Sequence, residues 1–503
     1  MKKVTFDKSA MDKMRVGLDK TANAVSGTIG PRGRNVFIGD QMTPKVTNDG
    51  HTIASQISFP DKLEELGSYV VRNTSGQQND DVGDGTTTVT VLLQSIIHEA
   101  LKRPENPMQI RTSLNEAGKK LLKILAKKSI KINKADILKV ALISAENEEL
   151  AKLITEIINK LGEKAIINVE DSKTFATDYE VVDGYEAHVG FMSPHFITDK
   201  KTARAVYSDI PVLVTEKKIS NISDIAPLFE QFKKAGIGQC VIVCEDIDDA
   251  MLGVFVVNKN MGQFNALVIR ATGPLLLDIE GATGAKAISN NNGITFASVK
   301  LEHLGKAKKI VCDANKTLFL GNKESAHRHA LNLEKQADNE ANMFVAKKLR
   351  ERVAKLRGGV AVLRIGAPTD LEREYLKFKA EDSVKAVQAA LAEGVVEGGG
   401  MTLWRIASDM KPKTIGEEIL KKALTAPLRK IIENAGKDYA EIIRNLGQKE
   451  GYDAKEDKYV DMIKAGIIDP TKVERCALEN AISNAGSFIT TFCVISDYVE
   501  PKD

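Results

Sequence analysis

The sequence is poor in cysteine, has little net charge and contains no long apolar run, and each of these absences excludes a class of protein. Its five cysteines are spread over 503 residues without a C-x-x-C pair, which argues against a disulfide framework and a zinc site. We expect them to be reduced and mostly buried. The net charge is +3 and the basic residues are scattered, so nucleic acid is not expected as a partner. No apolar stretch reaches the roughly 18 residues of a membrane span, so no membrane association is predicted.

Common targeting and nucleotide-binding signals are also missing. The first residues, 1–7, run into charged positions without the apolar block of a signal peptide, so the cytoplasm is the expected location. No G-x-x-x-x-G-K-[ST] motif occurs, and an ATPase activity would therefore not be of the P-loop kind. Because there is no low-complexity linker, hinges are expected in short glycine-bearing connections, at Gly184, Gly358 and Gly359.

Helical patterns dominate the beginning of the chain. Apolar residues spaced three and four apart predict an amphipathic helix over 7–29, capped at Asp7. A short strand is expected over 35–38, and further helices over 63–77 and 86–101.

The middle of the chain has a different texture. Short apolar runs at 165–169, 212–214 and 240–244 predict strands, and a helix is expected between them over 223–235. Beyond this α/β region we predict a long charged helix over 334–353, a strand over 361–365, and mainly helices from Asp382 onward. The length allows about two to four domains, and the order of patterns predicts a discontinuous helical domain that carries an α/β insertion.

A glycine-containing turn precedes the helix predicted over 86–101. Residues 84–88 read Asp-Gly-Thr-Thr-Thr and follow the loop-forming residues 79–83. The amides at a helix start attract anions, the glycine allows close approach, and the hydroxyls add donors, so this turn suits phosphate. Asp84 would be a hard oxygen ligand for magnesium. The alternative is plain N-capping of the helix by Asp84.

A second turn, over 28–35, joins a helix to a strand. The alternative to a functional role here is an ordinary turn in which Gly33 supplies a positive φ. Taken with 84–88, this segment resembles the group I chaperonins, the GroEL-type ring proteins, over nearly the whole chain. The matching segments, in family order, are 28–35, 83–88, 381–382 with 393–400, and 466–473.

The resemblance implies an ATP site that uses magnesium and potassium. Asp84 would bind Mg²⁺, and Asp49 and Asp382 would flank the attacking water, with Asp382 coming from a different domain. The alternative for Asp382 is a solvated helix face. The implied nucleotide contacts are Thr28, Gly30, Pro31, Asp84, Gly85, Thr86, Thr87, Thr88, Gly399, Asp453, Ala454, Ile467 and Asp469.

Two apolar segments, 191–197 and 251–257, resemble the client-binding rim of the family. Core packing is the usual reason for such segments and remains the alternative for each residue. The resemblance implies contact with unfolded client proteins and with a co-chaperonin lid through Phe191, His195, Phe196, Phe229, Leu252, Val256 and Val257.

Several positions depart from the family pattern. Asn48 stands where group I members usually have lysine, and Val189 where they often have arginine. The segment after Pro274 is shorter than usual, and the Gly/Met-rich tail of many members is not found before Asp503. These differences are typical of a divergent member that retains the catalytic aspartates.

The resemblance implies three domains: equatorial over 1–127 and 393–503, intermediate over 128–182 and 361–392, and apical over 183–360. It further implies a homo-oligomer of two stacked seven-membered rings. We predict an ATP-dependent chaperonin subunit that captures unfolded proteins on the apical rim and encloses them for folding. The alternatives are a holdase or scaffold with little or no ATP hydrolysis, and a metabolic ATP-dependent enzyme, for which the middle domain offers no convincing cluster of His, Asp and Lys.

Overall fold

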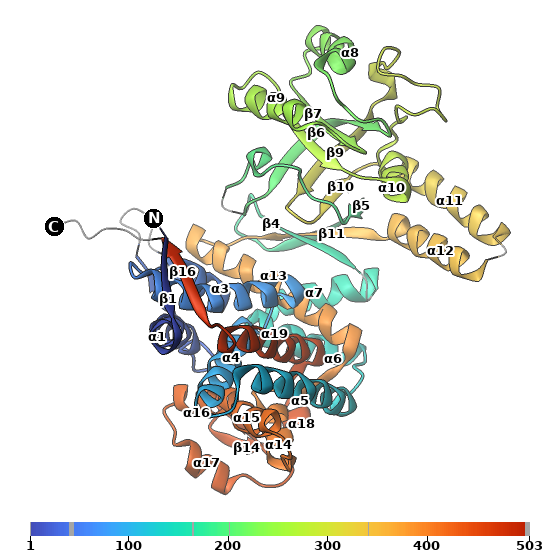
Figure 1. The fold of residues 1–503 in the computed structure, drawn as a ribbon. Helices are drawn as coiled ribbons and strands as arrows, with labels where there is room; N and C mark the ends of the chain where they lie inside the picture. Colours follow the sequence, from blue (N-terminus) through green and yellow to red (C-terminus); the bar gives the residue numbers. More distant parts are fainter. Residues whose placement is uncertain (1, 40–44, 163–164, 201, 341, 498–503) are drawn as a thin grey trace. The chain divides into compact units, whose positions relative to one another are not determined.

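The computed structural model describes residues 2–39, 45–162, 165–200, 202–340 and 342–497. The chain forms two compact units, which Figure 1 colours along the sequence. The helical unit comprises 1–163, 171–177 and 365–503, and the sheet unit comprises 164–170 and 178–364. A helical unit supplied by both ends of the chain, with an α/β unit inserted, is the multidomain architecture that the sequence predicts.

Among the described residues, the helical unit is built mainly from helices, together with four two-stranded sheets. Its first part contains β1 (Lys2–Phe6), α1 (Asp7–Ser26), β2 (Val36–Ile38), β3 (Lys45–Thr47), α2 (Gly50–Gln56), α3 (Lys62–Val82), α4 (Thr86–Leu101), α5 (Pro107–Lys128), α6 (Lys134–Ala145) and α7 (Glu148–Leu161). Its second part contains α13 (Asp370–Glu393), β12 (Val395–Glu397), α14 (Met401–Asp409), α15 (Ile415–Ala423), α16 (Ala426–Asn434), α17 (Tyr439–Asn445), β13 (Gly451–Asp453), β14 (Lys458–Val460), α18 (Met462–Ala465), β15 (Ile468–Pro470), α19 (Thr471–Ile489) and β16 (Cys493–Asp497).

The core of the helical unit lies where α1, α3, α4, α5 and α19 pack together. Helix α4 is apolar on most of its surface, and Leu92, Leu93, Ile96 and Ile97 have no exposed surface. Helices with this composition are stable only when they are covered. The core therefore fixes the start of α4, which is the end that carries residues 84–88.

The sheet unit contains one sheet of eight strands in the order β4-β11-β5-β10-β9-β6-β7-β8. Its elements are β4 (Ile166–Asp171), β5 (Asp178–Ala187), η1 (Pro194–Phe196), β6 (Ala205–Thr215), α8 (Ile222–Ala235), β7 (Gln239–Cys244), α9 (Asp249–Asn260), β8 (Asn265–Arg270), α10 (Gly273–Thr283), η2 (Leu301–His303), β9 (Gly305–Cys312), β10 (Thr317–Leu320), α11 (Lys323–Asn339), α12 (Met343–Arg357) and β11 (Gly359–Ile365). Strands β6, β7 and β8 pair in parallel, and α8 and α9 connect them, as parallel pairing requires.

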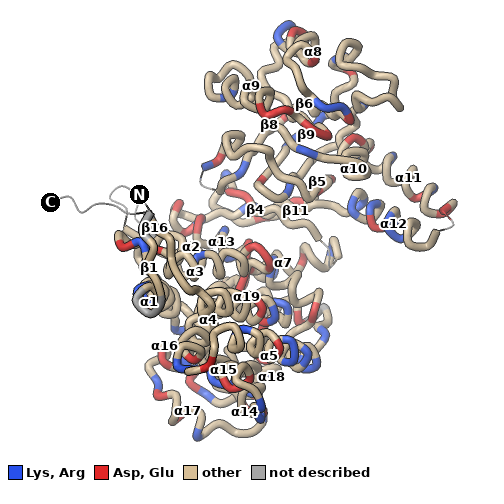
Figure 2. The backbone as a smooth tube through the Cα atoms, viewed as in Figure 1, with Lys and Arg blue, Asp and Glu red and all other residues tan. Residues whose placement is uncertain are grey.

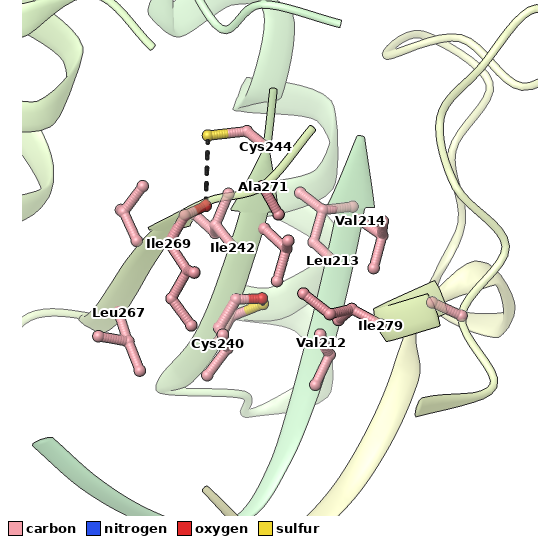
Figure 3. Close-up of a cluster of buried hydrophobic side chains, with 14 of the residues drawn as sticks. Val212, Leu213, Val214, Cys240, Ile242, Cys244, Leu267, Ile269, Ala271 and Ile279 are labelled. Carbon is pink, nitrogen blue, oxygen red and sulfur yellow. Dashed lines mark hydrogen bonds between the residues drawn. The ribbon is translucent and has the colours of Figure 1, made fainter. Parts of the chain in front are cut away.

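The parallel strands are buried and rich in β-branched residues, as expected for a sheet covered on both faces. Figure 3 shows Val212, Ile242 and Ile269 packed around the two cysteines of β7. The described structure contains five free cysteines, and all except Cys493 are buried, which confirms that they are mostly buried as predicted. Burial raises the pKa of the Cys240 thiol to about 12, so this side chain behaves as a small apolar group.

Three sequence predictions of local structure were wrong. Helix α1 begins after Phe6, so Asp7 is inside the helix and is not its N-cap. Residues 79–82 continue α3, because tertiary packing outweighs the weak helix propensity of Asn and Asp. The charged stretch 334–353 belongs to two helices, α11 and α12, and Asn342 caps the second by accepting hydrogen bonds from the Phe344 and Val345 amides.

Surface charge is mixed. Figure 2 shows acidic and basic residues interspersed along both units, in keeping with the nearly balanced composition. No helix among the described residues is long and apolar enough to cross a lipid bilayer. Helices α6, α7 and α13, which the resemblance assigns to an intermediate domain, belong to the helical unit here. The three-domain boundaries stay a prediction.

Candidate functional site

The turn between α3 and α4 has a backbone that only glycine adopts easily. Gly83 ends α3 with φ of 67° and Gly85 begins α4 with φ of 75°, both in the left-handed region. The Asp84 carboxylate accepts a hydrogen bond from the Gly85 amide at 2.6 Å, and no side chain caps α4. Plain N-capping of α4 by Asp84 is therefore wrong, and the first amides of α4 face the site without a side-chain acceptor.

Thr28 and Gly30 lie beside the start of α4. The Thr28 and Thr87 hydroxyl oxygens are 3.2 Å apart. Gly30 has φ of 84°, whereas Gly33 is not among the residues with positive φ. The expectation that Gly33 supplies a positive φ is therefore wrong. A Cβ at Gly33 would lie 2.0 Å from the Thr28 carbonyl oxygen, so close backbone approach is what requires glycine there. Pro31, the next residue after Gly30, is exposed on this turn.

Asp49 reaches the same helix end from α2. Its carboxylate caps α2 by accepting from the Thr52 amide at 2.6 Å, and its other oxygen accepts from the Thr86 hydroxyl at 3.3 Å. A Cβ at Gly50 would lie 2.7 Å from the Thr87 hydroxyl oxygen, so this turn packs directly on α4. Thr88 is half-buried in the same first turn.

Asp382 on α13 belongs to the same cluster of carboxylates. Its pKa is raised well above the usual value, first by burial and then by the negative charges of Asp84 and Asp49. Lys379 and Lys385 partly offset this effect. Burial likewise raises the pKa of Asp84. The half-buried position of Asp382 and the effect of the Asp84 and Asp49 charges on its pKa argue against the solvated helix face given as its alternative.

Sequence reasoning missed the cations and the hydroxyl that border this cluster. Lys379 pairs with Glu146 at 2.8 Å, and the Ser144 hydroxyl donates to Asp84 at 3.3 Å. Lys379 and Lys385 lie three residues before and after Asp382, a spacing that puts all three on one helix face. That spacing is a signal in the sequence that could have identified both lysines.

Gly399, Ile467 and Asp469 meet where β12 pairs with β15. The Asp469 carboxylate accepts from the Gly399 amide at 3.0 Å, and the Gly398 amide donates to the Ile467 carbonyl at 3.0 Å. Burial, followed by the charge of Asp84, raises the pKa of Asp469 to about 7. Because the charge of Asp84 acts on Asp469, this group of residues is linked electrostatically to the turn before α4.

Ala454 lies in an apolar cluster beside the site, and the carboxylate of the adjacent Asp453 is hydrogen-bonded within its own loop. Ala454 is buried in an apolar cluster with Ile29, and Ile467 packs against the same cluster. The Asp453 carboxylate accepts hydrogen bonds from the Lys455 amide at 2.9 Å and from the Glu456 amide, so it stabilises its own loop.

The residues that the resemblance assigns to client contact all lie in the sheet unit, and they differ in solvent exposure. His195 and Val257 are exposed, with 49% of Val257 accessible. Phe191, Phe229, Leu252 and Val256 are half-buried.

Core packing accounts for the most buried of these side chains. Phe196 has no exposed surface, so the core-packing alternative holds for it. The Phe229 ring contacts those of Phe232, Phe255 and Phe264. The Lys259 ammonium donates to the His195 carbonyl at 2.9 Å and so attaches this segment to α9.

The donor set around Asp84 suits a magnesium ion shared with a ligand. No group of three or more His, Cys, Asp or Glu among the described residues could hold a metal by itself. Mg²⁺ is commonly held by one or two carboxylates together with water and substrate phosphates. Asp84 keeps part of its surface exposed, so its carboxylate fits that role.

Comparisons with known proteins agree over almost the whole chain. A sequence model described as the TCP-1/cpn60 chaperonin family matches residues 21–498. Two crystal forms of the chaperonin gp146 from the bacteriophage EL 2 (Pseudomonas aeruginosa), both in the presence of ATP-BeFx, are similar in structure, with TM-scores of 0.70 and 0.67. Each comparison covers 99% of both chains at 19% sequence identity. A likeness at this identity shows that the fold is shared.

Proposed function

Because the chain belongs to the TCP-1/cpn60 chaperonin family, we propose that it is an ATP-dependent chaperonin subunit. In this proposal it captures unfolded proteins on an apolar surface of the sheet unit and encloses them for folding through ATP-driven domain motions. The observation that carries the ATPase is the convergence of Asp49, Asp84 and Asp382 at the uncapped start of α4. An uncapped helix start beside hydroxyls suits phosphate.

The proposed chemistry is attack of water on the terminal phosphoryl group of ATP. The α4 amides, Thr86, Thr87 and Thr88 would hold the phosphates, with Thr28, Gly30 and Pro31 beside them. Asp49 and Asp382 would orient the water, and one of them would accept its proton as the new P–O bond forms and ADP leaves. Bound at Asp84, Mg²⁺ would neutralise phosphate charge, and K⁺ remains the second proposed cation.

The other wall of the site would hold the nucleoside. Gly399, Ile467 and Asp469 suit the ribose and adenine, because they combine a backbone turn, an apolar side chain and a carboxylate. Ala454 would contact the base from the adjoining apolar cluster. Asp453, which directly precedes Ala454, is also proposed to lie near the base.

The proposed partners are unfolded clients, a co-chaperonin lid and further copies of this chain. Val257, Leu252, Val256, Phe191, Phe229 and His195 offer accessible surface for clients. Exposed apolar side chains on or directly beside the small sheets of the helical unit support self-association, since Phe37 is 67%, Phe6 52% and Phe492 67% exposed. Two stacked seven-membered rings and a cytoplasmic location complete the proposal.

A holdase with weak hydrolysis is the second candidate, and one observation favours it. Burial and the charges of Asp84 and Asp49 raise the pKa of Asp382, which increases the fraction of this carboxyl that is protonated, and that fraction cannot accept a proton from water. Cations supplied with the nucleotide would restore the carboxylate, because a nearby positive charge lowers a carboxyl pKa. Whether turnover occurs with magnesium therefore separates the two functions.

The test is ATP hydrolysis by the purified protein with Mg²⁺ and K⁺, combined with sizing by light scattering. We expect Asp382→Ala to lower turnover about 100-fold or more while the assembly stays intact. Asp370→Ala on the same helix is the matched control, since that side chain is 88% exposed. A monomeric, inactive wild type would favour the holdase.

A further inference from the structure

One face of α13 lies against the end of α3, where the turn before α4 begins. Asp382, Lys385 and Ala389 are spaced three and four residues apart on α13, so they share this face. Ala389 belongs to the same small buried cluster as Val82, the last residue of α3. The cluster therefore anchors this face of α13 at the end of α3.

The Lys385 side chain lies across the glycine that follows α3. A Cβ at Gly83 would be 1.8 Å from the Lys385 Cδ atom, so a side chain at Gly83 would displace the lysine. The Lys385 ammonium donates to the Asn79 carbonyl at 3.4 Å, and the Gly83 amide donates to the same carbonyl at 2.9 Å. The last carbonyls of a helix carry partial negative charge. The end of α3 is therefore a suitable partner for this cation.

These contacts follow the same order along both segments. Toward the start of α13, the face passes from Ala389 to Lys385 to Asp382. Along the turn, the chain passes from the end of α3 through Gly83 to Asp84. Asp382 is thus directed toward Asp84, in agreement with the effect of the Asp84 charge on Asp382.

Lys385 attaches α13 to a different element from the other polar contacts of this part of the helix. The Ser383 hydroxyl donates to the Ala141 carbonyl of α6 at 3.1 Å. Lys379 pairs with Glu146, directly after α6, at 2.8 Å. Lys385 instead reaches α3 and the turn before α4, which is the turn that would hold the phosphates.

We propose that Lys385 is a positioning residue for the proposed hydrolysis, because it lies across Gly83, binds the carboxyl end of α3 and so holds Asp382 beside the turn before α4. The inference rests on the proposed function, since it needs Asp382 to act on the attacking water. A general base must lie within hydrogen-bond reach of the proton that it accepts. A displacement of about 1 Å can lower a rate about 100-fold.

The experiment measures kcat and KM for ATP hydrolysis by the whole protein, together with MgADP affinity by calorimetry. Lys385→Met keeps an extended side chain but loses the ammonium that binds the Asn79 carbonyl. We expect kcat to fall about tenfold or more, while MgADP affinity and the free energy of unfolding stay nearly unchanged. Lys385→Arg can donate to the same carbonyl and should recover most of kcat.

Lys377→Met is the matched control on α13. It removes an ammonium that binds Asp171 at 3.1 Å, away from the turn before α4, and should behave as wild type. An unchanged kcat in Lys385→Met would overturn the positioning role, as would a loss of MgADP affinity as large as the loss of kcat. Recovery of the Lys385→Met rate at higher pH would also overturn it. Lys385 lowers the pKa of Asp382, so that recovery would show an effect of charge and not of position.

If Lys385→Met does not fold, as circular dichroism would show, Gly83→Ala decides, because its new Cβ must displace the lysine side chain. A fall in kcat at unchanged MgADP affinity supports the inference, and an unchanged kcat overturns it. A wild type that does not hydrolyse ATP would remove the proposed function together with the inference. An active wild type whose kcat is insensitive to these changes would remove the inference alone.

Discussion

At the scale of single residues, the backbone of Gly85 controls the start of α4. Its φ of 75° is left-handed, and a Cβ there would lie 2.7 Å from Val473. The positive φ and the lack of space for a Cβ both constrain the turn that exposes the first amides of α4. The sequence marks this glycine as part of a phosphate turn, but only the structure shows that its conformation leaves α4 without a side-chain cap.

We therefore expect Gly85→Ala to weaken ATP binding at least about tenfold and to destabilise the protein by about 1–3 kcal/mol. Nucleotide titration and thermal unfolding measure the two effects. Gly27→Ala is the matched control, because Gly27 has φ of −64° and its nearest atom would be 3.9 Å from the new Cβ. Equal loss of binding in both variants would show that glycine conformation is not the cause.

At the scale of elements, α1 and α3 approach so closely that their backbones touch at glycines. A Cβ at Gly67 would lie 1.8 Å from the Met14 carbonyl oxygen, and one at Gly17 would lie 1.9 Å from the Glu64 carbonyl oxygen. Backbone atoms cannot move aside as a flexible side chain can. This contact fixes α3, whose end leads into Asp84.

Gly67→Ala should accordingly destabilise the helical unit by about 3 kcal/mol or more, because the two helices must separate. Gly76→Ala on the same helix should be neutral or slightly stabilising, since its new Cβ would come no closer than 3.4 Å to His51. Chemical denaturation followed by circular dichroism compares them. A neutral Gly67→Ala would contradict the close packing.

Elements with strong periodicity were predicted well, and boundaries that depend on packing were not. Helix α4 begins and ends at the predicted residues, Thr86 and Leu101, because its apolar pattern and the glycine before it agree. Helix α3 extends to Val82, past the predicted end at Gln77. The sequence could not show this, since polar residues 79–81 are kept helical by contacts from distant parts of the chain.

At the scale of the whole molecule, the proposed capture of clients depends on which apolar side chains the fold leaves accessible. Val257 is 49% exposed on α9, whereas Phe255, two residues earlier, is buried. Accessible apolar surface binds unfolded chains without demanding a sequence. For the proposed client binding, the position of an apolar residue on the helix therefore matters more than its hydrophobicity.

Val257→Glu is expected to reduce suppression of client aggregation several-fold without changing ATP turnover, because an apolar segment bound at the proposed capture surface would have to desolvate the new charge. Leu277→Glu, on α10 of the same unit and 40% exposed, is the matched control and should retain suppression. Light scattering of a denatured test protein gives the measurement. Equal loss in both variants would mean that the capture surface does not centre on α9.

The sequence by itself determined the family, the multidomain α and α/β architecture, and the residues of the turn before α4. These follow from local patterns and motif order, which can be recognised directly in the amino-acid sequence. Tertiary structure decided what depends on distance: that the charges of Asp84 and Asp49 act on Asp382, and that Phe196 is core. The pKa of a carboxyl depends on burial and on charges distant in sequence, so no pattern of neighbouring residues could have indicated it.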